Sequence, residues 1–113
     1  MTRRRVVLTG LGMISPIGNS VAEAWAAALA GTNGITRITR FDPSRLASQI
    51  AGEVKKFDVA PYMSPKEARR MDLFIHYGMA AGLQAWRECG ITVNESNAER
   101  IACPDNLPVD FVE

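Results

Sequence analysis

The sequence is poor in the residue types that carry most enzyme chemistry. It has one histidine, His76, and two cysteines, Cys89 and Cys103, in 113 residues. A mechanism that needs two imidazoles within this chain is therefore excluded by counting. Neither cysteine has a histidine or another cysteine at the spacing of metal ligands, so we expect two free, partly buried thiols, no metal site and no disulfide framework.

Strong net charge and long apolar runs are also lacking. The 13 basic and 12 acidic residues give a formal charge of +1, too little to attract nucleic acid or an anionic membrane. No apolar stretch approaches the roughly 20 residues that span a bilayer. Three arginines precede an apolar run, as in a signal peptide, but glycines and Ser15-Pro16 interrupt it and no clean cleavage pattern follows. We therefore expect a cytoplasmic protein with no membrane or nucleic-acid partner.

The proportions of apolar and charged residues, 47% and 22%, are typical of one globular domain. Residues 4–10 (RRVVLTG) are mostly β-branched or apolar after the arginines and end in glycine, which predicts a buried strand. Gly10 and Gly12 then suggest a dinucleotide-binding loop, but Ser15 occupies the third glycine position of GxGxxG. We interpret the two glycines as a tight turn and expect no cofactor.

The next predicted element is a helix. A capping-box pattern that starts at Ser20 predicts an alanine-rich helix over residues 21–30, which Gly31 ends. Trp25 and Leu29 lie one turn apart and are interpreted as a core pair.

Two short strands are expected after this helix, at residues 35–38 and 50–54, with turn-forming sequences between them.

A second, longer helix is predicted from about Pro65 to Cys89. Ser64 supplies a cap, a proline occupies the first helical position and an acid the third. Gly78 and Gly82 within it each cost roughly 1 kcal/mol relative to alanine, so we expect them to allow close packing against another backbone. His76 is interpreted as a hydrogen-bonded structural residue, and the methionines and aromatic residues of this helix as core.

Three basic residues stand out at the start of this predicted helix. Lys66, Arg69 and Arg70 fall at i, i+3 and i+4, so they project from one side of its first turns. The helix amino terminus already carries positive partial charge, so cations placed there favour a site for an anionic partner. The alternative is a solvated face with Glu67 and Asp72 as counter-charges. The residues alone leave both interpretations open.

Several motifs follow one another along the chain: RRVVLTGLGMISPIGN, EAWAAALAGTNGI, FDPS, AGEVKKFD and SPKEARRMDLFIHYGMAAGLQAW. Over about residues 4–102 they resemble the start of the type II β-ketoacyl-[acyl-carrier-protein] synthases of fatty-acid synthesis. The resemblance implies an α/β protein, an incomplete portion of a thiolase-like (α/β/α/β/α) fold. Members of the family are homodimeric acyltransferases that extend an acyl chain by decarboxylative Claisen condensation with malonyl-acyl carrier protein, using one cysteine and two histidines.

The motifs that carry those catalytic residues, similar to TACTSG, HGTSTP and GHLLGAAG, do not occur in this sequence. The last residues, CPDNLPVDFVE, resemble a late segment of the family. This divides the chain into an amino-terminal ketoacyl-synthase-like region, residues 1–102, and a tail, residues 103–113. A read-through sequence with a fortuitous match is the alternative for the tail. We therefore expect no catalytic residues, and a truncated or internally deleted relative that is inactive alone.

The resemblance also bears on the basic residues. Matching residues of the family dock the acidic helix and phosphopantetheine-bearing end of acyl carrier protein, and they carry over to Lys66, Arg69 and Arg70. We therefore expect acyl carrier protein as a partner, together with self-association or association with a full-length synthase. Three alternatives stay open: a non-catalytic module that binds carrier protein or a full-length synthase, a poorly folded remnant, and an unrelated small enzyme that uses Cys89 or Cys103.

Overall fold

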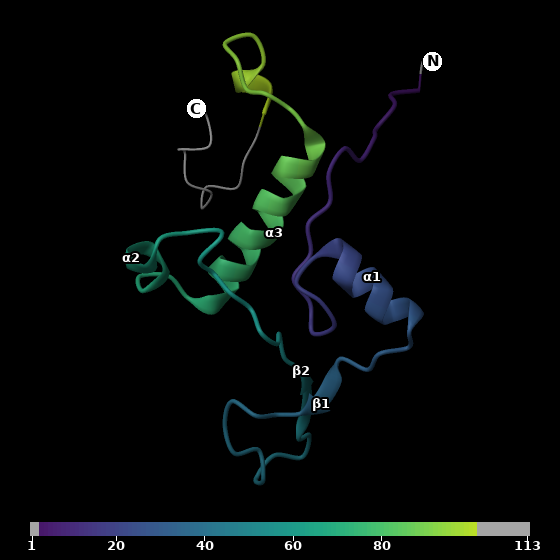
Figure 1. Ribbon diagram of the computed structural model, residues 1–113, viewed down its shortest axis with the longest axis vertical. Helices are drawn as coiled ribbons and strands as arrows, with labels where there is room; N and C mark the ends of the chain where they lie inside the picture. Colours follow the sequence, from purple (N-terminus) through teal and green to yellow (C-terminus); the bar gives the residue numbers. More distant parts are fainter. Residues whose placement is uncertain (1–2, 102–113) are drawn as a thin grey trace.

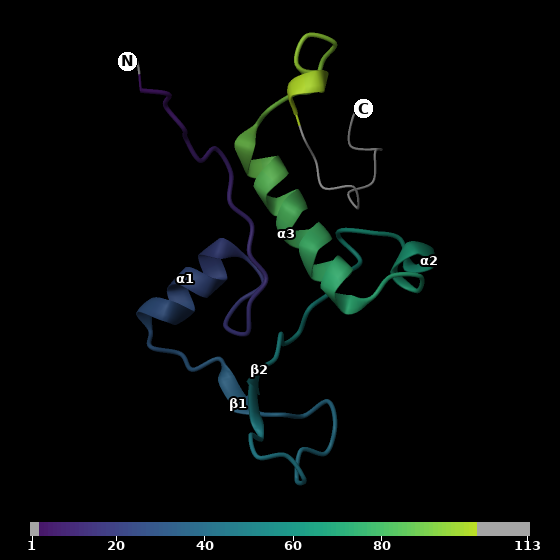
Figure 2. The ribbon, with the colours of Figure 1, turned by 180° about the vertical axis from the view of Figure 1, so that it is seen from behind.

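The computed structural model describes residues 3–101, and the predicted boundary at Ala102 and the tail with Cys103 lie outside them. Within residues 3–101 the helices and strands follow in the order α1 (Val21–Leu29), β1 (Ile35–Arg37), β2 (Ile50–Gly52), α2 (Pro65–Ala68), α3 (Leu73–Cys89) and the 3-10 helix η1 (Ala98–Arg100). In Figures 1 and 2, α3 lies between α2 on one side and the amino-terminal segment with α1 on the other. The radius of gyration, 17.6 Å, exceeds the value of about 13 Å expected for a compact chain of this length.

Helix α1 is specified by its cap, as predicted. The Ser20 side chain accepts a hydrogen bond from the Glu23 backbone at 3.2 Å, and Gly31 follows the helix with φ +69°. The prediction that Trp25 and Leu29 form a core pair is wrong, because they are 65% and 71% exposed. No other layer of residues 3–101 covers that face of the helix.

The two short strands are confirmed as an antiparallel pair. Strands β1 and β2 pair Ile35 with Gly52, Thr36 with Ala51 and Arg37 with Ile50. They are one to two residues shorter than predicted. The described residues thus hold a two-stranded sheet, and the pair sits at the end of the molecule away from η1 (Figure 1).

The buried strand predicted for residues 4–10 is not formed. This segment runs as an irregular trace that pairs with no strand among residues 3–101, and Val6, Val7 and Leu8 are 90%, 67% and 85% exposed. The prediction is wrong because a strand buried on both faces requires neighbours on both edges and both faces. The described residues do not supply them.

Gly10 and Gly12 allow this segment to approach α3, which corrects their interpretation as a tight turn. A Cβ atom on Gly10 would lie 2.1 Å from the Ala85 carbonyl oxygen, and one on Gly12 would lie 1.8 Å from that of Ala81. Only glycine fits at either position. By contrast, nothing lies within 4 Å of a Cβ built on Gly78, so the predicted close packing at this helix glycine is wrong.

Two side chains of α3 hold the same segment in place. Glu88 Oε2 accepts a hydrogen bond from the backbone N–H of Leu11 at 2.6 Å, and Gln84 Oε1 accepts one from Met13 at 3.1 Å. Two residues of extended chain span about 6 Å, and so does one turn of helix. The N–H groups of Leu11 and Met13, two residues apart, therefore meet the side chains of Glu88 and Gln84, which are four residues apart on α3.

The single helix predicted from Pro65 to Cys89 is instead two helices. Helix α2 ends at Ala68, and Asp72 occupies the N-cap position of α3 with an extended backbone at ψ 159°, although its side chain makes no cap hydrogen bond. Aspartate is a poor helix-interior residue, which favours a break at this point. The end of α3 is as predicted, because Gly90 takes the left-handed conformation at φ +64°.

The core is small and centred on α3. Met79, Ala80 and Leu83 are at most 2% exposed, and Ala24 of α1 and Met63 join them as buried apolar residues. The predicted core role is confirmed for Met79, but Phe74 is 70% exposed. Among the described residues, no helix is both long and apolar enough to cross a membrane.

Candidate functional site

The three basic residues singled out by the sequence lie in α2 and in the turn that follows it. Lys66 lies within α2, Arg69 is the C-cap residue of α2, and Arg70 follows in the turn. All three are exposed. Arg69 keeps a right-handed helical backbone, and its N–H donates to the Pro65 carbonyl at 3.3 Å. The one-turn spacing of Lys66 and Arg69 therefore survives, and we name Lys66, Arg69 and Arg70 the basic corner.

The helix dipole acts on this cluster differently from what the sequence predicts. The predicted long helix placed all three cations in its first turns, where the helix dipole opposes them. In the structure α2 ends at Ala68, so Arg69 and Arg70 lie beyond its carboxyl end, where negative partial charge favours cations. The helix dipole therefore does not oppose these two arginines, and it gives no support for an anion site. What supports such a site is that the basic residues are exposed and close together in the chain.

A capping box fixes the start of α2. Ser64 Oγ accepts a hydrogen bond from the Glu67 N–H at 3.4 Å, and Glu67 Oε2 accepts one from the Ser64 N–H at 3.0 Å. The Ser64 hydroxyl also donates to Glu67 Oε2, and this bond, followed by the backbone one, lowers the pKa of Glu67 below its usual value. The Glu67 carboxylate is thus directed to the cap.

The carboxyl end of α2 is anchored to α3 by the histidine. His76 is buried, and its Nε2 lies 2.9 Å from the Ala68 carbonyl oxygen at the end of α2, which otherwise accepts only a long hydrogen bond from the Met71 N–H, at 3.5 Å. This contact agrees with the interpretation of His76 as a structural residue.

Aromatic residues anchor the loop that precedes α2. The Phe57 ring stacks on Tyr62 with centroids 6.1 Å apart and meets Tyr77 of α3 edge-on at 5.0 Å. The Tyr62 hydroxyl accepts a hydrogen bond from Gln84 Nε2 at 3.0 Å. Both ends of α2 are therefore tied to α3, and the basic corner is held at a defined place.

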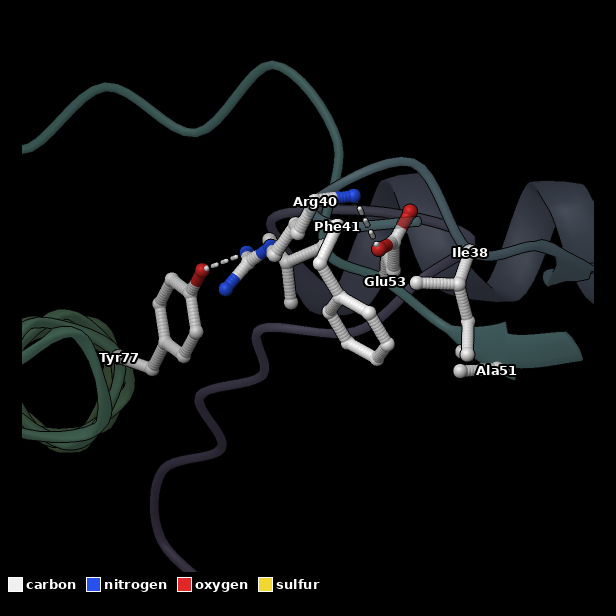
Figure 3. A pocket seen from close by; sticks show the side chains of 8 residues that line it. Ile38, Arg40, Phe41, Ala51, Glu53 and Tyr77 are labelled. Atoms are coloured by element: carbon white, nitrogen blue, oxygen red, sulfur yellow. Dashed lines mark hydrogen bonds between the residues drawn. The ribbon is translucent and has the colours of Figure 1, made fainter. Parts of the chain in front are cut away.

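A hollow of about 270 Å³ lies between the β1–β2 pair and α3 (Figure 3). Arg40 donates a hydrogen bond to the Tyr77 hydroxyl across it at 2.9 Å, and this bond raises the pKa of Arg40 further above its usual value. Glu53 accepts hydrogen bonds from the Thr39 hydroxyl and backbone, which lower its pKa. Its carboxylate is thus engaged in structure. The sequence analysis missed this feature, because no local pattern links residue 40 to residue 77.

The cysteine and the histidine of the described residues do not lie beside each other. Cys89 and His76 both lie on α3, 13 residues apart, which separates them by roughly 20 Å along the helix. The Cys89 thiol donates to the Trp86 carbonyl oxygen at 3.1 Å. Over residues 3–101, no group of three or more His, Cys, Asp or Glu residues is placed to hold a metal ion.

Comparison with known proteins places these features in a family. The family model described as "Beta-ketoacyl synthase, N-terminal domain" matches residues 3–103. The 3-oxoacyl-[acyl-carrier-protein] synthase 2 of Vibrio cholerae serotype O1 is 55% identical over 101 residues, which cover 89% of this chain and 24% of that protein. The same enzyme of Staphylococcus aureus (strain COL) is 45% identical over 98 residues, covering 87% of this chain and 24% of that protein.

A solved structure agrees with the sequence comparisons. The ishigamide ketosynthase/chain length factor superposes with a TM-score of 0.70 at 38% identity, over 80% of this chain and 23% of that chain. The described residues therefore share the fold of part of a ketosynthase, as the resemblance implied. This chain spans about a quarter of the length of the relatives that it matches. It belongs to the β-ketoacyl synthase family and matches the amino-terminal domain of that family.

Proposed function

We propose that this chain engages acyl carrier protein through the basic corner of Lys66, Arg69 and Arg70 and does not itself catalyse condensation. The observation that carries the proposal is that all three cations are exposed on a turn tied to α3 at both ends of α2. A surface held in this way loses less conformational freedom on binding than a mobile one.

The chemistry of the partner supports this choice. The names of the relatives specify an acyl-carrier-protein substrate, and the family resemblance implies an acidic docking helix on that protein. Three cations within one turn match such a helix, because complementary charge gives orientation and faster association. The pairs are exposed, so each contributes little alone, a few tenths to about 1 kcal/mol.

The proposal that no condensation occurs rests on the residues of this chain. The cysteine and two histidine motifs of the family are absent from the 113 residues, which contain one histidine. That histidine binds the end of α2 and lies roughly 20 Å along α3 from Cys89.

An NMR titration of ¹⁵N-labelled acyl carrier protein with this chain tests the docking. We expect shifts confined to one acidic face, and no shifts with the double variant Lys66→Glu with Arg69→Glu. The matched control is Arg37→Glu with Arg45→Glu, which changes the net charge by the same amount at two exposed positions, the last residue of β1 and the loop that follows it. Circular dichroism verifies that all variants fold equally.

Two results would contradict the docking proposal. Equal loss of binding in both double variants would mean that only net charge matters, and equal binding in both would mean that the basic corner is a solvated face. Binding is also expected to weaken steeply as salt rises, because exposed charges are screened over a Debye length of about 8 Å at physiological ionic strength.

A further inference from the structure

Arg40, in the segment between β1 and β2, is a cation that its neighbours hold in place but do not neutralise. Its Nη2 donates a hydrogen bond to the Tyr77 hydroxyl at 2.9 Å, which uses one of the several N–H donors of a guanidinium group. The nearby carboxylate of Glu53 accepts instead from the Thr39 hydroxyl at 2.8 Å and from the Arg40 backbone N–H at 3.3 Å. The contact with Tyr77, rather than the charge of Glu53, is the main cause of the raised pKa of Arg40.

One turn of α3 positions both Arg40 and the end of α2. His76 Nε2 lies 2.9 Å from the Ala68 carbonyl oxygen, and the next residue, Tyr77, binds Arg40. Figure 3 shows the Tyr77 hydroxyl directed from α3 to the guanidinium. Successive residues of a helix are about 100° apart around its axis, and a helix with its side chains is about 10–12 Å across, so the two contacts lie within roughly 15 Å of each other.

We propose that Arg40 is a second docking point for acyl carrier protein, where it binds a carboxylate on the same acidic helix that meets the basic corner. This inference rests on the docking proposed above. Because an α-helix rises 1.5 Å per residue, a helix of about ten residues spans roughly 15 Å and can contact both places. A guanidinium group held by Tyr77 loses little freedom on binding and presents its remaining N–H groups to a carboxylate.

A second cation at this distance determines the direction of the bound helix. The basic corner alone is one cluster of charge, about which an acidic helix can turn. With Arg40 as a second point, one orientation satisfies both sets of charges, and complementary charge is what sets the orientation of a complex. Arg37 and Arg45 are also exposed cations near β1, but in the described part of the chain Arg40 is the one that Tyr77 ties to α3.

The titration of ¹⁵N-labelled acyl carrier protein tests this role with single charge reversals. Arg40→Glu should weaken binding at least fivefold and remove the shifts at one end of the acidic helix, while the shifts caused by the basic corner remain at the other end. The matched control, Arg45→Glu, changes the net charge equally in the same segment and should leave the affinity within twofold of the parent and the pattern of shifts unchanged. Equal weakening by both variants would overturn the proposal, because net charge alone would then explain the loss.

Tyr77→Phe provides a test that changes no charge. It removes the hydroxyl that holds Arg40 and should weaken binding about two- to threefold, with the loss of shifts at the same end of the helix as in Arg40→Glu. Combined with Arg40→Glu it should cause no further loss, because both changes remove the same contact. Unchanged affinity in Arg40→Glu and in Tyr77→Phe would mean that their contact only stabilises the fold, and would overturn the role of Arg40 while leaving the basic corner intact. A parent chain that causes no shifts would overturn both proposals.

Discussion

Replacing Gly12 with alanine tests the close approach of the amino-terminal segment to α3. The added Cβ would lie 1.8 Å from the Ala81 carbonyl oxygen, 2.7 Å from its carbon and 3.0 Å from the Ala85 nitrogen. All three are backbone atoms of a helix, which cannot yield as a flexible side chain can. Since ordinary contacts lie near 3.5 Å, the segment has to move outward by more than about 1 Å.

The magnitude follows from the contacts that this movement disturbs. Overpacking of this kind costs about 1–3 kcal/mol, and outward movement also stretches the hydrogen bonds from Leu11 to Glu88 and from Met13 to Gln84. Each hydrogen bond contributes about 0.5–1.5 kcal/mol, at the lower end here because both are exposed. We expect Gly12→Ala to lower the free energy of unfolding by about 2 kcal/mol.

Urea unfolding monitored by tryptophan fluorescence and far-ultraviolet circular dichroism measures this change. Both are recorded at one low protein concentration, the same for every variant. The matched variant is Gly78→Ala, whose Cβ meets nothing within 4 Å, and it should raise the free energy of unfolding by about 0.5–1 kcal/mol through helix propensity. An unchanged stability in Gly12→Ala, or a loss in Gly78→Ala, would refute the described packing.

Three further changes test the anchoring of α2 and of the β1–β2 pair. Hydrogen bonds lower the pKa of Glu67 in the folded state. The contribution of Glu67 to folding stability is therefore complete above its unfolded pKa of about 4.3 and is lost as the pH falls through the lower folded pKa. Helical circular dichroism should drop in this acid range in the parent chain and less in Glu67→Gln. His76→Phe should lower the free energy of unfolding in urea by about 1 kcal/mol, because the Ala68 carbonyl loses its shorter hydrogen bond and keeps only the long one from Met71, and an unchanged midpoint would contradict that role. Tyr77→Phe removes the hydrogen bond to Arg40 but should cost less than about 1 kcal/mol, since this arginine is exposed; a larger loss would show that the contact is buried.

The elements specified by local chemistry could be predicted from the sequence. The cap at Ser20 and the left-handed Gly90 depend on neighbouring residues, and the structure contains both. The short strands β1 and β2 were also predicted, although each forms only by pairing with the other. The family was also evident from the order of the motifs, which the comparisons confirm.

The features that depend on distant residues could not be predicted in this way. The pattern of residues 4–10 indicates a buried strand, but burial requires partner strands that residues 3–101 do not provide. Trp25 is exposed for a similar reason, because residues 3–101 provide no element that covers its face of α1. The hydrogen bond between Arg40 and Tyr77 joins residues far apart in the chain, and the break at Asp72 is stabilised by His76 from the next helix.

The proposal that this chain docks acyl carrier protein without condensing acyl groups is tested most directly by product analysis. The purified chain is mixed with acyl- and malonyl-acyl carrier protein at concentrations where the titration shows binding, and mass spectrometry follows the carrier-bound products. The account predicts neither 3-ketoacyl product nor decarboxylated malonyl carrier protein. Formation of either product by the parent chain, abolished by Cys103→Ala or Cys89→Ala, would contradict it.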